Sequence, residues 1–263
     1  MKRFVLVVTL FLGACTGGRM HIPPFAAKPF EPISRQAVVA IALREWRLFG
    51  QPVVEGPPDP TVKAEREPGL WQRVGEYWWL GLNAEAPEIA WTGKHDSQGR
   101  VFDAEQDGDF AWSAAFVSYV MRIAGAGARF PYAADHAHYI NIAKRMTLGS
   151  TEDWLLTAER PEAYAPRPGD LICFGRNRAG GLRYDDLPTA TLFPAHCDIV
   201  VDTSRRGVIA VIGGNIRDAV SMTYVPVTDD GKLATADGTV LDPRSPWMAV
   251  LRLRVSDDGG ASI

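Results

Sequence analysis

The amino-acid sequence predicts an α+β fold in which helices come first along the chain and antiparallel strands follow. Apolar residues recur at helical spacing up to about residue 146, and short β-type runs replace this pattern from Gly169 onward. This order of elements is typical of the α+β class. The 263 residues, of which 46% are hydrophobic and 22% charged, have an ordinary globular composition, so we expect one main domain with extensions.

The N-terminus has the pattern of a secretory signal. Lys2 and Arg3 precede an apolar run from Phe4 to Leu12 that is too short to span a bilayer as a folded anchor. The ending L-G-A-C resembles the lipobox of bacterial lipoproteins. The resemblance implies a signal peptide at 1–14, a lipidated Cys15 and a Gly- and Pro-containing tether at 15–33.

The predicted location follows from that resemblance. It implies a protein of the bacterial cell envelope that is held to a membrane by its lipid anchor and does not cross it. Thr16, and not Asp, follows Cys15, which favours the outer membrane, facing the periplasm. An ordinary signal peptide with a chance cysteine is the alternative. The net charge of −3 gives no electrostatic reason to expect a nucleic acid as partner.

Residues 34–100 are predicted to form an N-terminal helical extension. Ser34 can cap a helix that runs to about Phe49, and helical periodicity returns between Glu67 and Asn83. The proline-rich stretch between these helices, and the stretch from Ala84 to Gly108, are typical of loops. The α+β domain itself is expected at 101–256.

The segment from Asp109 to Ala124, D-F-A-W-S-A-A-F-V-S-Y-V-M-R-I-A, is predicted to be a buried helix. Asp109 can cap its start, and Gly125 stands where a helix commonly ends. Ser113 then lies in the first turn, where unpaired N–H groups and the helix dipole favour a developing negative charge. Its hydroxyl is either a cap or a nucleophile.

A further helix is expected from about Ala134 to Met146, and it contains A-D-H-A-H-Y-I. His136 and His138 are two residues apart, so they lie on different faces and do not form a metal pair. One of them can face a cleft near Ser113, and ordinary packing is the alternative. No metal site and no organic cofactor is predicted.

The strands carry a second group of polar residues. His196 opens one strand, and Asp198 shares its face because side chains alternate with period two. Cys197 must point to the opposite face. It can pair with Cys173 in an oxidising periplasm, or both can be free thiols in the core. Asn215 follows a Gly-Gly pair at the end of the next strand, where we expect it within reach of His196.

Taken in order, these motifs resemble those of a known superfamily. The helix start W-S-A-A-F-V, then P-G-D-L, a strand that opens in His and a G-G-N turn look like the NlpC and CHAP branch of papain-like cell-wall hydrolases. The resemblance implies a papain-like core in which a helix packs on a small antiparallel sheet. Segments such as W-T-G-K-H-D and A-D-H-A-H-Y-I are closer to an uncharacterised family of bacterial lipoproteins within that superfamily.

The resemblance also implies roles for single residues. Ser113 occupies the position of the attacking cysteine, His196 that of the base and Asn215 that of the group that orients it, while Asp198 can raise the basicity of the imidazole. Trp112, His136 and His138 are then candidate substrate-binding residues.

Three functions remain open. A hydrolase would act on an amide or ester bond, and the resemblance implies peptidoglycan peptide or another envelope glycopeptide as its substrate. Because a serine replaces the thiol, the alternative is a catalytically inactive pseudoenzyme that binds envelope glycopeptide or a partner protein in the same cleft. A structural lipoprotein that docks through its aromatic N-terminal region is a third hypothesis.

Overall fold

The computed structural model describes residues 32–57, 62–83, 87–103 and 105–255. The described residues belong to one compact unit that begins at Pro32. The predicted signal peptide 1–14, the predicted lipidation site Cys15 and all but the last two residues of the predicted tether 15–33 lie outside the described residues. In the part that is described, no helix is long and apolar enough to cross a membrane.

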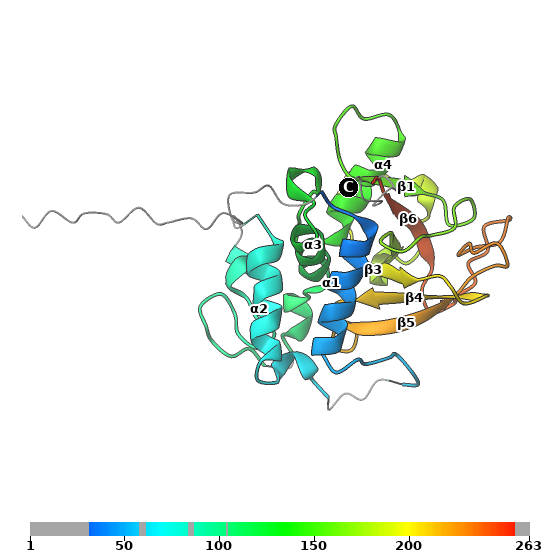
Figure 1. Cartoon of the computed structure of the whole chain (residues 1–263). Helices are drawn as coiled ribbons and strands as arrows, with labels where there is room; N and C mark the ends of the chain where they lie inside the picture. The colour runs from blue at the N-terminus through cyan, green and yellow to red at the C-terminus, as the bar shows by residue number, and fades with distance from the viewer. Residues whose placement is uncertain (1–31, 58–61, 84–86, 104, 256–263) are drawn as a thin grey trace, which may run out of the picture. The chain divides into compact units, whose positions relative to one another are not determined.

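The described residues form four α-helices and a six-stranded antiparallel sheet, which confirms the predicted α+β class (Figure 1). The helices are α1 (Arg35–Leu48), α2 (Leu70–Gly81), α3 (Ser113–Ile123) and α4 (His136–Thr147). The strands are β1 (Leu156–Glu159), β2 (Leu171–Gly175), β3 (Ala195–Asp202), β4 (Val208–Gly213), β5 (Ser221–Pro226) and β6 (Trp247–Leu253).

The strand order in the sheet is β1-β6-β2-β3-β4-β5. Strand β1 was not predicted, because its sequence L-T-A-E is only four residues long and lies in a stretch without a clear β-type run. The remaining strands all lie after Gly169, where the sequence predicts short β-type runs.

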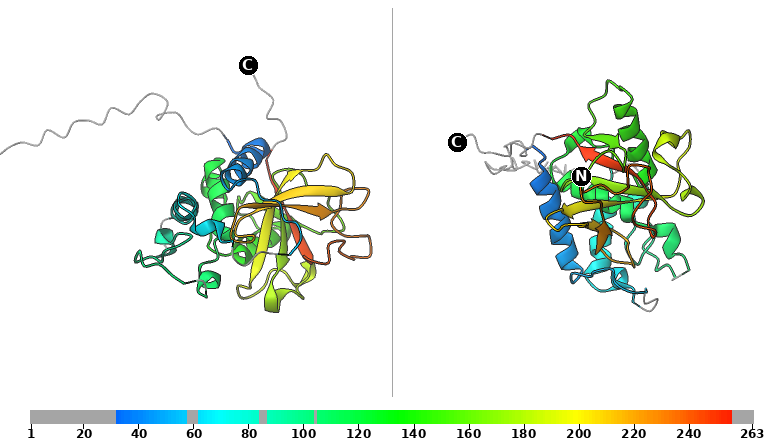
Figure 2. Two further views of the ribbon diagram at one scale, coloured as in Figure 1. Left: turned by 90° about the horizontal axis from the view of Figure 1, so that it is seen from below. Right: turned by 90° about the vertical axis from the view of Figure 1, so that its right-hand side faces the viewer.

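The helices gather on one side of the sheet (Figures 1 and 2). Helices α1 and α3 pack on β3 and β4, helix α4 packs on β1, and α2 packs on α3. This side contains the main core, to which α3 contributes fully buried Phe116 and Val120. A smaller core on the other face includes Val200, Val211 and Leu233, so the segment between β5 and β6 covers that face.

Asp170 of the P-G-D-L motif joins α1 to the sheet. Its fully buried carboxylate accepts hydrogen bonds from the Arg35 guanidinium at 2.7 Å, the Tyr164 hydroxyl at 3.0 Å and the backbone N–H of Leu253 at 2.9 Å. A buried carboxylate is costly unless it is paired and hydrogen-bonded. These bonds therefore fix the start of α1 against β2 and β6.

Glu45 joins the first three helices in a similar way. Its carboxylate is fully buried and accepts hydrogen bonds from Arg73 at 2.6 Å and from the Tyr77 hydroxyl at 2.8 Å. Arg44, which also bonds Glu45, donates to the Tyr119 hydroxyl of α3 at 2.8 Å. Residues 34–100, predicted as a helical extension, thus contribute two helices that bond each other and α3 directly.

Candidate functional site

Helix α3 begins at Ser113, four residues later than the predicted cap at Asp109. The residues Asp107–Phe110 form a separate 3-10 turn, and Ala111 is extended, so the helix cannot continue through them. Trp112 is the N-cap and makes no side-chain capping bond. Ser113 is therefore the first helical residue, and the N–H groups of this first turn have no partner within the helix. The predicted end at Gly125 is confirmed, with φ 92°.

Trp112 lies in the core. Its side chain is 1% exposed, stacks near Phe49 and Tyr77, and donates its indole N–H to Glu65. It lines neither of the cavities described below. Trp112 therefore anchors the start of α3 in the core, and its side chain does not line the candidate site.

Ser113 contacts His136, the first residue of α4. The distance from Ser113 Oγ to His136 Nε2 is 2.7 Å, and both side chains are buried. The Asp135 side chain caps α4 by accepting from the backbone N–H of His138 at 2.9 Å, which sets where the helix begins. His138 is exposed, so the prediction that the two histidines lie on different faces is confirmed, and His136 is the one at the site.

The other nitrogen of the His136 ring, Nδ1, is hydrogen-bonded to the hydroxyl of Tyr139. Burial raises the pKa of Tyr139 well above 10.0, with Asp135 adding to the effect, so the hydroxyl stays protonated. Among the described residues that hydroxyl has no other partner, and a buried O–H is costly unless it donates. The hydroxyl therefore donates to Nδ1, which places the imidazole proton on Nε2, facing Ser113.

His136 is neutral at neutral pH. Burial lowers its pKa well below 6.5, and the nearby charges of His196 and Arg176 act in the same direction. A histidine with so low a pKa is a weak base, but once protonated it readily gives up its proton.

His196 and Asp198 form a second polar pair, on β3. His196 Nε2 lies 2.8 Å from Asp198 Oδ1, and both residues are buried. This confirms that the two side chains share a face of the strand. Cys197 points to the opposite face, as predicted, where it forms a disulfide with Cys173 of β2. Of the two arrangements that the sequence left open, the structure has the paired one.

The Gly-Gly pair makes room for these side chains. A Cβ atom on Gly213 would lie 1.9 Å from Asp198 Oδ1 and 3.0 Å from His196 Nε2, and one on Gly214 would lie 2.5 Å from Cβ of Phe116 on α3. Only glycine can bring the end of β4 this close to both elements. The predicted close approach of the backbone is thereby confirmed.

Asn215 follows in the left-handed region, at φ 55°. The antiparallel register of β3 and β4 brings it to the level of His196, and both residues line the same cavity. No hydrogen bond joins the described side chains of Asn215 and His196, however, and the carboxylate of Asp198 holds the imidazole instead.

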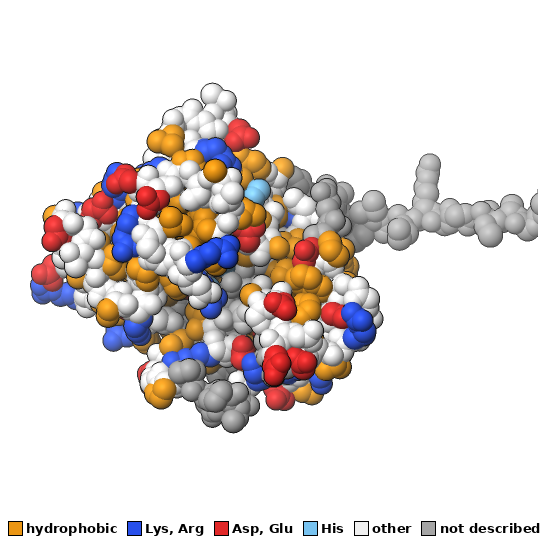
Figure 3. Space-filling model, turned by 180° about the vertical axis from the view of Figure 1, so that it is seen from behind, with side chains coloured by type: hydrophobic (Ala, Val, Ile, Leu, Met, Phe, Trp, Pro, Cys, Tyr) orange, Lys and Arg blue, Asp and Glu red, His pale blue; other side chains and the backbone are white. Residues whose placement is uncertain are grey.

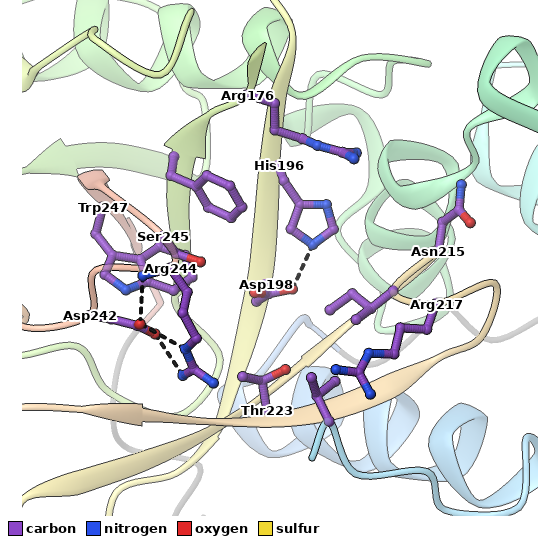
Figure 4. Close-up of a pocket in the computed structure, with 13 residues that line it drawn as sticks. Arg176, His196, Asp198, Asn215, Arg217, Thr223, Asp242, Arg244, Ser245 and Trp247 are labelled. Atoms are coloured by element: carbon purple, nitrogen blue, oxygen red, sulfur yellow. Dashed lines mark hydrogen bonds and ion pairs between the residues drawn. The ribbon is translucent and has the colours of Figure 1, made fainter. Parts of the chain in front are cut away.

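Two adjoining cavities open at these residues. The larger, of about 530 Å³, is lined by Ser113, His136 and Asp218 among others. The smaller, of about 270 Å³, is lined by His196, Asp198 and Trp247 among others (Figure 4). Arg176, Asn215 and Arg217 line both. The rings of His136 and His196 are 5.3 Å apart, so the two polar pairs belong to one cleft, which we call the serine cleft.

The structure thus brings together five predicted residues, namely Ser113, His136, His196, Asp198 and Asn215, and leaves Trp112 and His138 outside the cleft. Sequence reasoning missed Tyr139, Arg176 and Arg217. Tyr139 follows His136 by three residues, a spacing that puts both on one helix face, so this contact had a signal in the sequence. In the described part of the chain, no three His, Cys, Asp or Glu side chains gather closely enough to hold a metal ion.

The fold and the site define an α+β protein with a serine at a helix start, a histidine in contact with it and a histidine–carboxylate pair beside them. The chain belongs to the family described as an uncharacterized protein conserved in bacteria (DUF2272), whose model matches residues 65–253. The match includes every residue of the serine cleft named above. No curated protein and no solved structure matches the chain.

Proposed function

We propose that the protein is a papain-like hydrolase of the bacterial envelope, held by a lipid anchor at Cys15, which cleaves an amide or ester bond of peptidoglycan peptide or a related glycopeptide. The observation that carries the proposal is the contact of 2.7 Å between Ser113 Oγ and His136 Nε2 at the start of α3. A disulfide between Cys173 and Cys197 is consistent with an oxidising compartment such as the periplasm.

In the proposed reaction, Ser113 Oγ attacks the carbonyl carbon of the ligand. His136 reacts as its other tautomer, in which the imidazole proton is on Nδ1 and the Tyr139 hydroxyl accepts it. The proton of Ser113 then passes to the free Nε2, and the protonated His136 gives it from Nε2 to the leaving amine or alcohol as the C–N or C–O bond breaks. The N–H groups of the first turn of α3, which have no partner within the helix, would stabilise the oxyanion. Water then hydrolyses the acyl-serine. His196, held by Asp198, is the second group in the cleft that can accept a proton.

The second candidate function is binding without turnover. It is favoured by the proton on His136 Nε2, because in that state Ser113 accepts a hydrogen bond and is not activated. The low pKa of His136 acts in the same direction. A pseudoenzyme of this kind would retain the serine cleft and recognise envelope glycopeptide or a partner protein there.

Activity measurements on single variants separate the two functions. The mature protein is tested on peptidoglycan and on small ester and amide substrates, beside Ser113→Ala, His136→Ala and His196→Ala, with exposed His138→Ala as the matched control. For the hydrolase, the three cleft variants lose activity and His138→Ala keeps it. If wild type and all variants are equally silent while glycopeptide still binds, the hydrolase is refuted and the pseudoenzyme is supported.

The variant Ser113→Cys tests whether the cleft lacks only a competent nucleophile. A thiol is a much better nucleophile near neutral pH than an alcohol. Activity that appears only in Ser113→Cys would show a cleft that binds and orients its ligand but lacks a competent nucleophile. Activity already present in the wild type supports serine catalysis.

A further inference from the structure

Two arginines stand where the two cavities of the serine cleft meet. Arg176 directly follows β2, and Arg217 lies in the turn after β4. Together with Asn215 they line both the cavity that contains Ser113 and the one that contains His196. Figure 4 shows the Arg176 side chain on one side of the His196 ring and the Arg217 side chain on the other.

The carboxylates of the cleft form no ion pair with these arginines. Each of the four that line the two cavities already has another partner: Asp135 accepts from the N–H of His138, Asp218 pairs with Lys63 at 3.2 Å, Asp198 accepts from His196, and Asp242 pairs with Arg244 at 2.8 Å. Within the described part of the chain, neither Arg176 nor Arg217 has a carboxylate within 4.0 Å. The cleft therefore contains two guanidinium groups that are in no ion pair with a described carboxylate.

The two guanidinium groups are held differently. Arg217 donates to the backbone carbonyls of Glu55, at 3.0 Å, and Gly56, which orient the group without removing its charge. The Arg176 residue is exposed, and its guanidinium group makes no hydrogen bond to a described residue, although its backbone N–H donates to Pro194 O at 2.8 Å. Its charge nevertheless reaches the site, because it contributes to the lowered pKa of His136. One arginine is thus positioned in advance, and the other is free to close on a ligand.

We propose that Arg176 and Arg217 form an oxyanion-binding subsite of the serine cleft, so that its ligand is an acidic peptide or glycopeptide carrying a carboxylate or phosphate beside the bond at Ser113. The reference to that bond rests on the proposed function. A guanidinium matches both oxyanions through parallel N–H donors. Asn215, which lines the same junction, adds an amide donor.

The cleft has no general excess of positive charge, because four carboxylates line the two cavities beside the guanidinium groups of Arg176, Arg217 and Arg244. The whole chain carries a net charge of −3, and acidic and basic side chains are interspersed on the face shown in Figure 3. A general attraction for anions therefore does not account for the paired arginines at the junction. Such a cleft selects ligands that carry an anionic group at the position of the two arginines.

The test measures equilibrium binding to Ser113→Ala, in which turnover by the serine is removed. The probes are a muramyl tripeptide with free carboxylates, the same peptide with its carboxylates amidated, and inorganic phosphate. Arg176→Gln and Arg217→Gln are made in this background. Arg178→Gln is the matched control, because Arg178 is also exposed, lies in the same loop and lines neither cavity.

The carboxylated peptide is expected to bind Ser113→Ala and to lose about tenfold or more in affinity on amidation or in either cleft variant. Arg178→Gln should stay within about twofold of its parent, since it removes only a distant surface charge. Phosphate that binds more tightly than the peptide, with the same loss in both cleft variants, would identify a phosphate-bearing ligand. Equal binding of acid and amidated peptide, an equal loss in Arg178→Gln, or no binding of either anion overturns the subsite.

This outcome is separable from that of the proposed function. Hydrolysis of a neutral ester by the wild-type protein is measured in parallel. Anion binding without hydrolysis supports the subsite and refutes the hydrolase. Hydrolysis without any effect of Arg176→Gln or Arg217→Gln on binding supports the hydrolase and refutes the subsite. Unchanged thermal midpoints of the variants exclude misfolding as the cause of a loss.

Discussion

The backbone of Gly213 lies against the carboxylate of Asp198, so closely that a Cβ atom on Gly213 would come within 1.9 Å of Oδ1. The carboxylate is on β3, the glycine ends β4, and the His196 ring completes the contact. The His196 imidazole can take this position because Gly213, in the neighbouring strand β4, has no side chain.

Gly213→Ala should therefore displace the His196–Asp198 pair. We expect a loss of about 1–3 kcal/mol in the free energy of unfolding, typical of overpacking in a close-packed site. Gly181→Ala is the control, since a Cβ atom there meets nothing within 4 Å, and it should change stability by less than about 0.5 kcal/mol. Urea unfolding measures both. Equal stability of Gly213→Ala and wild type would show that the strands separate easily at this point.

Tyr139→Phe tests the proton assignment of His136. Without the hydroxyl that donates to Nδ1, the imidazole proton can move from Nε2 to Nδ1, and Nε2 can then accept from Ser113. Nitrogen NMR of the ring should show this change of tautomer. The rate of labelling of Ser113 by a fluorophosphonate should rise about tenfold or more, since general-base assistance contributes about 10²–10⁴-fold. A fall in the labelling rate would mean that Tyr139 accepts from Nδ1 in the native protein.

The buried His136 predicts a pH effect on stability. Its pKa in the folded protein lies well below 6.5, mainly through burial, so the unfolded chain binds a proton first as the pH falls. The free energy of unfolding therefore decreases as the pH falls below 6.5, by up to about 1.4 kcal/mol per pH unit. His136→Gln should lose this dependence between about pH 6.5 and 5, whereas exposed His138→Gln should retain it. Chemical unfolding at several pH values gives the comparison.

The buried Glu45 predicts a second loss of stability, at lower pH. Burial raises the pKa of its carboxyl, but the hydrogen bonds and charge of Arg73, with Tyr77 and Arg44, outweigh it and bring the pKa below 4.5. Its stabilising contribution is present above pH 4.5 and is lost as the pH falls through the lower folded pKa. Glu45→Gln should be less stable than wild type at pH 7, by about 3–5 kcal/mol, because Arg73 loses its buried partner.

The matched control for this carboxylate is Glu76→Gln. Glu76 also pairs with Arg73, but its side chain is 42% exposed. An exposed ion pair contributes about 0–1 kcal/mol, so this variant should resemble wild type in urea unfolding. If both variants behave alike, the network around Glu45 is not a major source of stability.

Reduction of the disulfide should destabilise the protein. The bond joins residues 24 positions apart, and the loop-closure model gives about 3.5 kcal/mol for a loop of that length. The mature protein, unfolded without reductant, should show no free thiol at Cys173 or Cys197, and the Cys173→Ala, Cys197→Ala double variant should unfold at a lower urea concentration. Two free thiols in oxidised preparations would contradict the pairing.

Local periodicity was enough to predict much of the fold. The four helices, five of the six strands and the opposite faces of Cys197 and His196 follow from spacing alone, because these patterns depend on neighbours within a few residues. The start of α3 was misplaced at Asp109, since a capping-type residue and a 3-10 turn have similar sequence signals.

The partner of Ser113 could not be predicted in the same way. The sequence pointed to His196 by resemblance and offered His136 only as a possible neighbour, and the structure places the Nε2 atom of His136 at the serine. Periodicity tells which face of α4 His136 occupies, but the packing of α4 against α3 decides what that face meets. Arg217 was missed for a related reason, because it lies in a turn with positive φ, where spacing carries no information.

Strand β3 presents different chemistry on its two faces. One face carries the His196–Asp198 pair into the serine cleft, and the other carries the disulfide to β2. Both cysteines are fully buried, so a thiol reductant can reach the bond only where the fold opens. The covalent link to β2 and the polar pair are thus separated only by the backbone of β3, and one strand serves both the sheet and the site.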